Sequence, residues 1–158
     1  MILSVPHTGT RTIAKITGYP YLHTYDYTTP QDIRNRNGDG VICVPLRNPA
    51  DVWATWAQRY EARPFVLDPD HPKSMETAWR ALSAIDRIFD IVYVPVDRPD
   101  RDKQLAILSE RMGQVLHADW TPQGARPAER KQATVPERDL DFIYELPFVR
   151  RFYNREFT

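Results

Sequence analysis

The stretch Ile2-Leu3-Ser4-Val5-Pro6-His7-Thr8-Gly9-Thr10-Arg11-Thr12 decides the fold expected for this chain. A short apolar run ends at Pro6, a hydroxyl-rich turn with one glycine follows, and Ile13, Ala14 and Ile16 can then open a helix. The first N–H groups of a helix lack partners within the helix, and the helix dipole adds partial positive charge there. The stretch therefore predicts a strand, a tight turn and a helix N-terminus that binds a phosphate or sulfate group.

Two further apolar runs resemble the first, because each precedes a proline. Ile2 to Val5, Val41 to Val44 and Ile91 to Val94 are expected to be buried strands whose carboxyl ends are marked by Pro6, Pro45 and Pro95. Tyr19 to Tyr25 is a further candidate strand. Continuous apolar strands that alternate with helices predict an α/β protein of three layers, with a mostly parallel sheet of about four or five strands and helices on both faces.

Apolar residues at three- and four-residue spacing predict five helical regions. They are expected from the opening turn to Gly18, from Asn48 or Asp51 to about Tyr60, from near Pro72 to Phe89, from Asp100 to Gly113, and between Asp139 and Tyr153 with an interruption at Pro147. Two breaker-rich stretches, 64–72 and 121–136, are expected to be loops.

The composition predicts a single domain over residues 1–158 and limits the classes of partner. The 21 basic and 21 acidic residues balance, so no global field attracts nucleic acid or a membrane surface. No segment approaches the roughly 18 apolar residues that span a bilayer. A single cysteine, Cys43, lies in an apolar run, which favours a small buried side chain and a reducing cytoplasm.

Ligands of open parallel sheets bind at the carboxyl ends of the strands, and three segments leave those ends here. They are 7–12, 47–49 and 97–99, and the first two carry Arg11 and Arg47. Pro6 to Thr12 resembles the 5′-phosphosulfate loop of the sulfotransferase family, which uses 3′-phosphoadenosine 5′-phosphosulfate. Arg47 to Thr55 resembles its 3′-phosphate motif: an arginine leaving a strand, Asn-Pro, Asp-Val, and a hydroxyl residue eight positions beyond the arginine.

Weaker similarity to this family covers Val92 to Gly113 and Phe148 to Phe157. The resemblance implies a short bacterial- or phage-type member with a P-loop-like fold, and it implies the residues that hold the donor. These would be Pro6, His7, Thr8, Gly9, Thr10, Arg11 and Thr12 for the 5′ anion, and Arg47 and Thr55 for the 3′ phosphate.

Two positions of the loop depart from the family pattern. His7 stands where the family has a lysine or arginine that contacts the transferred group, and Arg11, which the usual loop lacks, could supply the missing charge. Both are therefore candidate catalytic residues. Thr12 stands where many members have an aromatic residue near the adenine.

The base that takes the acceptor proton has two candidates. His23 ends the candidate second strand, and its place between the two motifs resembles that of the family's catalytic histidine. A histidine near its reference pKa suits this role at neutral pH. A hydrogen-bonded structural histidine is the alternative for His23, and Asp26 is the reserve candidate for the base.

The expected function is transfer of a sulfuryl group to a hydroxyl or amine of a small-molecule or glycan acceptor, with no metal. Alternate tyrosines 19, 21, 25 and 27 could line the acceptor pocket, and the late basic residues Arg126, Arg130, Lys131, Arg150 and Arg151 could reach the 3′ phosphate. One alternative is a protein that binds the nucleotide bisphosphate without turnover. Another is a P-loop kinase of small molecules, although Gly9-Thr10-Arg11 lacks the Gly-Lys-Ser/Thr of that motif.

Overall fold

A parallel four-stranded sheet forms the centre of the protein. The computed structural model describes residues 1–26, 29–59, 74–121 and 135–154. The strands are β1 (Ile2–Ser4), β2 (Tyr21–His23), β3 (Ile42–Leu46) and β4 (Ile91–Pro95), in the order β2-β1-β3-β4. Every pairing is parallel. The chain therefore moves outward from β1 to β2, then returns past β1 to continue with β3 and β4.

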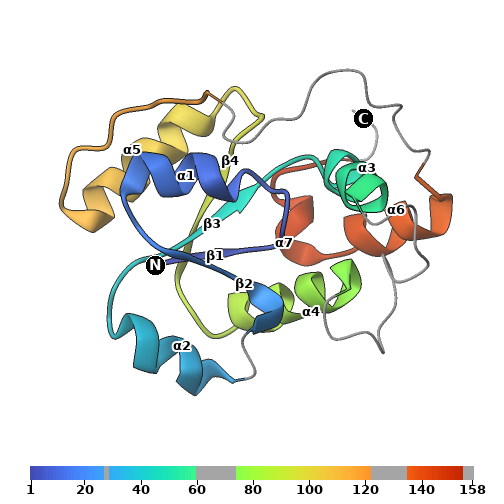
Figure 1. Ribbon diagram of the computed structural model, residues 1–158, viewed down its shortest axis with the longest axis horizontal. Coiled ribbons are helices and arrows are strands. Elements are labelled where there is room, and N and C mark those ends of the chain that lie inside the picture. Colours follow the sequence, from blue (N-terminus) through green and yellow to red (C-terminus); the bar gives the residue numbers. More distant parts are fainter. Residues whose placement is uncertain (27–28, 60–73, 122–134, 155–158) are drawn as a thin grey trace.

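Helices cover both faces of this sheet (Figure 1). On one face, α1 (Thr10–Thr17) and α5 (Arg101–Met112) pack on the side chains of Ile2, Cys43 and Val92. On the other, α4 (Met75–Asp86), α6 (Glu137–Tyr144) and α7 (Pro147–Arg150) join α2 (Pro30–Asn37) and α3 (Pro49–Arg59). The three-layer α/β architecture expected from the sequence is confirmed.

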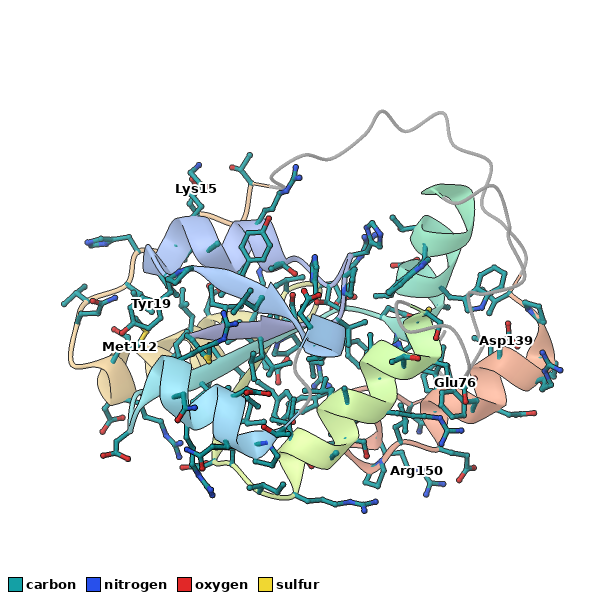
Figure 2. All side chains as sticks on the ribbon, turned by 60° about the horizontal axis from the view of Figure 1, so that its bottom comes forward. Lys15, Tyr19, Glu76, Met112, Asp139 and Arg150 are labelled. Atoms are coloured by element: carbon teal, nitrogen blue, oxygen red, sulfur yellow. The ribbon has the colours of Figure 1, made fainter. Side chains whose placement is uncertain are left out.

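Side chains alternate between the two faces of the sheet along each strand. Ile2 faces α1 and α5, whereas its neighbour Leu3 belongs to the larger core on the other side. That larger core contains the fully buried rings of Trp56, Trp79 and Phe148. Figure 2 shows the same division among the labelled side chains: Lys15, Tyr19 and Met112 lie on the side of α1 and α5, and Glu76, Asp139 and Arg150 lie toward α4, α6 and α7.

The predicted helix ends are largely confirmed. Gly18 and Gly113 end α1 and α5 in the left-handed conformation, with φ of 69° and 65°. The Asn48 side chain accepts a hydrogen bond from the Ala50 amide at 2.9 Å, so Asn48, and not Asp51, caps α3. The last helical region divides into α6 and α7 at Pro147, as expected.

Two expectations about the elements were wrong, and one helix was not predicted. Pro45 does not end its strand: β3 continues through it to Leu46, and the register with β4 is kept. The Cys43 amide donates to the Met1 carbonyl on the β1 side, and the Leu46 carbonyl accepts from the Val96 amide on the β4 side. Successive residues of a strand direct their backbone groups to opposite neighbours, so the nitrogen of Pro45, which carries no hydrogen, faces β1, where pairing is already ending. The helix expected to reach Phe89 ends at Asp86.

The third difference is α2, which sequence reasoning missed. It has a weak apolar face and buries only Ile33, but Thr29 and Asp32 form a reciprocal capping box at its start. The Thr-Pro-Gln-Asp pattern was the available signal. The loop expected at 64–72, with the helix start near Pro72, and most of the loop expected at 121–136 lie outside the described residues.

No helix in the described part of the chain is both long and apolar enough to cross a membrane.

Candidate functional site

Four segments meet at the carboxyl edge of the sheet, in the order of the strands. His23 ends β2, the loop that starts at Val5 follows β1, Arg47 follows β3, and Val96 follows β4. The direction of the winding reverses between β1 and β3, and open α/β sheets bind ligands at such a point. The structure thus brings the two sequence motifs onto adjacent strands.

The loop after β1 has a backbone that only certain residues tolerate. His7 adopts a positive φ of 69°, and Gly9 adopts a φ of 91° as the N-cap of α1. A Cβ on Gly9 would lie 2.7 and 2.9 Å from the two methyl groups of Val96, so glycine is required twice, for its conformation and for the close approach. Thr8 is fully buried, and its hydroxyl donates to the Val5 carbonyl at 2.7 Å, which makes Thr8 a support of the turn.

The start of α1 carries hydrogen-bond donors that lack protein acceptors. The first backbone hydrogen bond of the helix is from Ile13 to Gly9, at 3.2 Å. The amides of residues 9–12 have no acceptor in the described part of the chain. Thr10 is 6% exposed, and its hydroxyl has no hydrogen-bond partner among the described residues. A buried polar group without a partner is costly, so these donors fit an anion.

The two charged candidates of the loop have different surroundings. The ring of His7 packs edge-on against Trp56 of α3, with the ring centroids 5.7 Å apart. Arg11 is exposed on the first turn of α1. Thr12, the last predicted loop residue, is buried in the same turn, and Pro6 is buried beside the end of β1.

Arg47 and Thr55 lie where the 3′-phosphate motif predicts them, but they are unequally available. Arg47 leaves β3 with its side chain 38% exposed, and its guanidinium lies 3.7 Å from the Asp51 carboxylate. The Thr55 hydroxyl donates to the Asp51 carbonyl one turn earlier in α3, at 2.8 Å. Arg47 can therefore meet a phosphate as it stands, whereas Thr55 must first give up a helix hydrogen bond.

Asp97, to which the sequence analysis assigned no role, accepts hydrogen bonds from two segments beside Arg47. Asp97 accepts from the backbone amide of Asn48 at 2.6 Å and from the Tyr153 hydroxyl at 2.5 Å. The Tyr144 hydroxyl reaches the Asn48 side chain at 3.3 Å. Burial is the main cause that raises the pKa of Tyr153, and the charge of Asp97 adds to it.

The chain's C-terminal segment is held at the same place by a second contact. Arg98 donates to the carbonyl of Phe152 and forms an ion pair with Asp100 at 2.9 Å. The Asp97 and Arg98 contacts together attach the residues after α7 to the carboxyl end of β4. Only the tertiary structure reveals this attachment, because the partners are more than 50 residues apart.

His23 stands on the other side of the loop. Register pairs it with Ser4 of β1, and the Ser4 hydroxyl lies 3.1 Å from Nδ1 of its ring. Ser4 is fully buried, and sequence reasoning assigned it no role. Asp26 is exposed in the short 3-10 helix Thr24–Asp26 that follows. Of the four tyrosines proposed for an acceptor pocket, Tyr21 is exposed and contacts the His23 ring.

The other tyrosines and the late basic residues contribute little to this edge in the described structure. Tyr19 packs with the core under α1, and the side chains of residues 25 and 27 lie outside the described part. Residues 126, 130 and 131 also lie outside it. Arg151 pairs with Asp86 at 2.6 Å, and Arg150 lies 3.9 Å from Glu145.

A cavity of about 350 Å³ lies beside Tyr153, with Arg150 in its wall. Among the described residues, no group of three or more histidine, cysteine, aspartate or glutamate side chains is placed to hold a metal ion.

Comparison of the chain with models of known protein families, with curated proteins and with solved structures gave no match.

Proposed function

We propose that this protein binds 3′-phosphoadenosine 5′-phosphosulfate and transfers its sulfuryl group to a hydroxyl or amine of a small-molecule or glycan acceptor. One observation supports the proposal: segments that carry donors unpaired in the described part of the chain, or a cation, occupy the carboxyl ends of β1 and β3, neighbours in the sheet. The first offers amides of residues 9–12 and the buried Thr10 hydroxyl. The second offers Arg47. Two such segments suit a donor with two separate anionic groups better than they suit ATP.

Each segment has a chemical part in the transfer. An acceptor oxygen or nitrogen attacks the sulfur, the bond from sulfur to the bridging oxygen breaks, and adenosine 3′,5′-bisphosphate leaves. The amides at the start of α1 and the charge of Arg11 would stabilise the negative charge on the leaving group. Arg47 would hold the 3′ phosphate in a forked contact. The acceptor proton passes to a base, for which His23 and Asp26 are the candidates.

A second function is favoured by one feature of the loop. His7 replaces the cation expected beside the bridging oxygen, and its ring packs on Trp56. The same scaffold could therefore hold the bisphosphate nucleotide without turnover. Tight binding with no transfer to any acceptor in a broad panel would support this alternative.

Ligand binding tests the proposal before any acceptor is known. Thermal shift and calorimetry would compare adenosine 3′,5′-bisphosphate with ATP, AMP and inorganic sulfate, because a ligand of the native state raises its apparent stability. We expect a selective shift by the bisphosphate. No binding of the bisphosphate, or an equal shift by ATP, would refute it.

Arg47→Ala then tests the second anion segment. Loss of a charged hydrogen bond predicts bisphosphate affinity about 10- to 150-fold weaker. Arg111→Ala is a matched control, because Arg111 has a similar side-chain exposure of 43% and pairs with Asp90 before β4, at the opposite edge of the sheet. An equal effect of both substitutions would contradict the assignment of Arg47.

A further inference from the structure

Arg47 lies between two hydrogen bonds that join β3 to consecutive residues after β4. The Leu46 carbonyl accepts from the Val96 amide at 2.8 Å, and the Asn48 amide donates to the Asp97 carboxylate at 2.6 Å. The backbone on both sides of Arg47 is therefore attached to the segment that leaves β4, and this attachment sets the place from which the Arg47 side chain projects.

The second of these hydrogen bonds departs from the regular parallel ladder. Continuation of the β3–β4 register would make the backbone carbonyl of Val96 the acceptor for the Asn48 amide. The Val96 carbonyl instead accepts from the Arg101 side chain at 3.1 Å, and the Asp97 carboxylate accepts from the Asn48 amide. A carboxylate has a second oxygen, so this acceptor can also receive a hydrogen bond from a third segment of the chain.

That third segment is the one that follows α7. The second oxygen of Asp97 accepts from the Tyr153 hydroxyl at 2.5 Å, and Tyr153 is only 9% exposed. The next residue, Arg98, donates to the carbonyl of Phe152, and its guanidinium carbon lies 5.9 Å from the centroid of the Tyr153 ring. A buried tyrosine that belongs to neither sequence motif therefore holds the carboxylate that fixes the backbone beside Arg47.

We propose that Asp97 and Tyr153 are positioning residues for Arg47: the carboxylate, held by the tyrosine, fixes the backbone that presents the Arg47 guanidinium to the 3′ phosphate. The role in phosphate recognition rests on the proposed function, whereas the linkage of Tyr153 to the Asn48 backbone does not. A forked contact between arginine and phosphate requires a defined geometry, so a displaced backbone at Arg47 weakens it. The segment after α7 thus contributes to the choice of nucleotide without touching it.

Hydrogen exchange at the Asn48 amide tests the linkage without any ligand, because exchange reports local opening. Asp97→Ala removes the acceptor of this amide and should speed its exchange by about 10- to 150-fold. Tyr153→Phe removes a hydrogen bond that holds the carboxylate and should speed the same exchange by about 2- to 10-fold.

Tyr93→Phe is the matched control for the tyrosine variant. Tyr93 is also buried, and its hydroxyl donates to the carboxylate of Asp86, likewise at 2.5 Å, at the end of α4. This substitution should leave exchange at the Asn48 amide as it is in the wild type. Equal exchange in the two tyrosine variants, or unchanged exchange in Asp97→Ala, would overturn the linkage.

A double-mutant cycle with Arg47 tests the positioning role separately. In calorimetry, Asp97→Ala should weaken binding of adenosine 3′,5′-bisphosphate by about 10-fold, and it should cause no further loss in an Arg47→Ala background. A general weakening of the fold would instead lower the affinity in both backgrounds. Asp97→Asn should recover most of the affinity, because the asparagine oxygen still accepts from the Asn48 amide.

The outcomes separate the positioning role from the proposed function. Unchanged or tighter binding in Asp97→Ala, or the same loss with and without Arg47, would refute the positioning role. Absence of bisphosphate binding by the wild type refutes the proposed function instead, and the exchange experiment then still decides whether Tyr153 is linked to the Asn48 backbone.

Discussion

Gly9→Ala is the substitution whose cost the structure defines most closely. At a φ of 91°, an alanine pays the left-handed strain of about 1–2 kcal/mol. Its Cβ would also lie 2.7 and 2.9 Å from the two methyl groups of Val96. Rotation of Val96 can remove only one of the two methyls, since each rotamer leaves at least one of these positions filled. An overlap of this kind costs about 1–3 kcal/mol. The total expected loss in the free energy of unfolding is therefore about 2–5 kcal/mol.

Urea unfolding followed by tryptophan fluorescence measures this loss, and the chain offers a matched control. Gly113 has a φ of 65°, but a Cβ there would meet nothing within 4 Å. Gly113→Ala should therefore cost only the backbone part, about 1–2 kcal/mol. In a Val96→Ala background, Gly9→Ala should recover about 1–3 kcal/mol, which is the steric part. Equal costs for the two glycine substitutions, or no recovery with Val96→Ala, would refute the reasoning.

Three other substitutions and one chemical probe give further outcomes to measure. Thr10→Val removes a buried hydroxyl without a described partner, so it should raise the free energy of unfolding by about 1 kcal/mol, yet weaken bisphosphate binding in calorimetry. Trp53→Phe removes the indole donor 2.8 Å from the buried Asp139 carboxylate, and should cost about 1.5–3 kcal/mol in urea unfolding. Trp120→Phe is the control, because the indole of the half-buried Trp120 donates to Asp102 in a solvent-exposed hydrogen bond. Folding raises the pKa of Tyr153, so the stability that this group contributes is complete below about pH 10. Above that pH the contribution falls by about 1.4 kcal/mol per pH unit. The free energy of unfolding of Tyr153→Phe, measured in urea, should therefore decline less steeply above about pH 10 than that of the wild type. Burial raises the pKa of Cys43 to about 12, so a thiol reagent at pH 8 should modify it only at the rate of unfolding, and fast labelling of the native protein would contradict its burial.

The sequence predicted helix boundaries well where one residue determines the local backbone conformation. Glycine at the ends of α1 and α5 and Asn48 at the start of α3 specify helix boundaries through their own conformations and hydrogen bonds. Local reasoning failed at Pro45, because a proline interrupts pairing only on the side that its nitrogen faces. That side depends on which strands are neighbours, and the order of strands is a tertiary property.

The same distinction applies to the candidate site. Spacing along the chain located the loop after β1 and Arg47, because each follows an apolar strand directly. It did not locate the partners that orient them: Ser4 beside His23, Val96 against Gly9, and Asp97 on the amide of Asn48. Each of these contacts joins residues from different elements, and no periodicity in the sequence encodes it.

The sequence by itself determined the three-layer α/β fold, since buried strands and amphipathic helices follow from the pattern of apolar residues. It also predicted that hydrogen-bond donors gather in the loop after β1. Only the tertiary structure decided which donors remain available. It buried Thr10 without a described partner, used the hydroxyls of Thr8 and Thr55 within the protein, and set Ser4 against His23. The physical reason is that a hydrogen bond depends on distances of about 3 Å, which the packing of distant segments fixes.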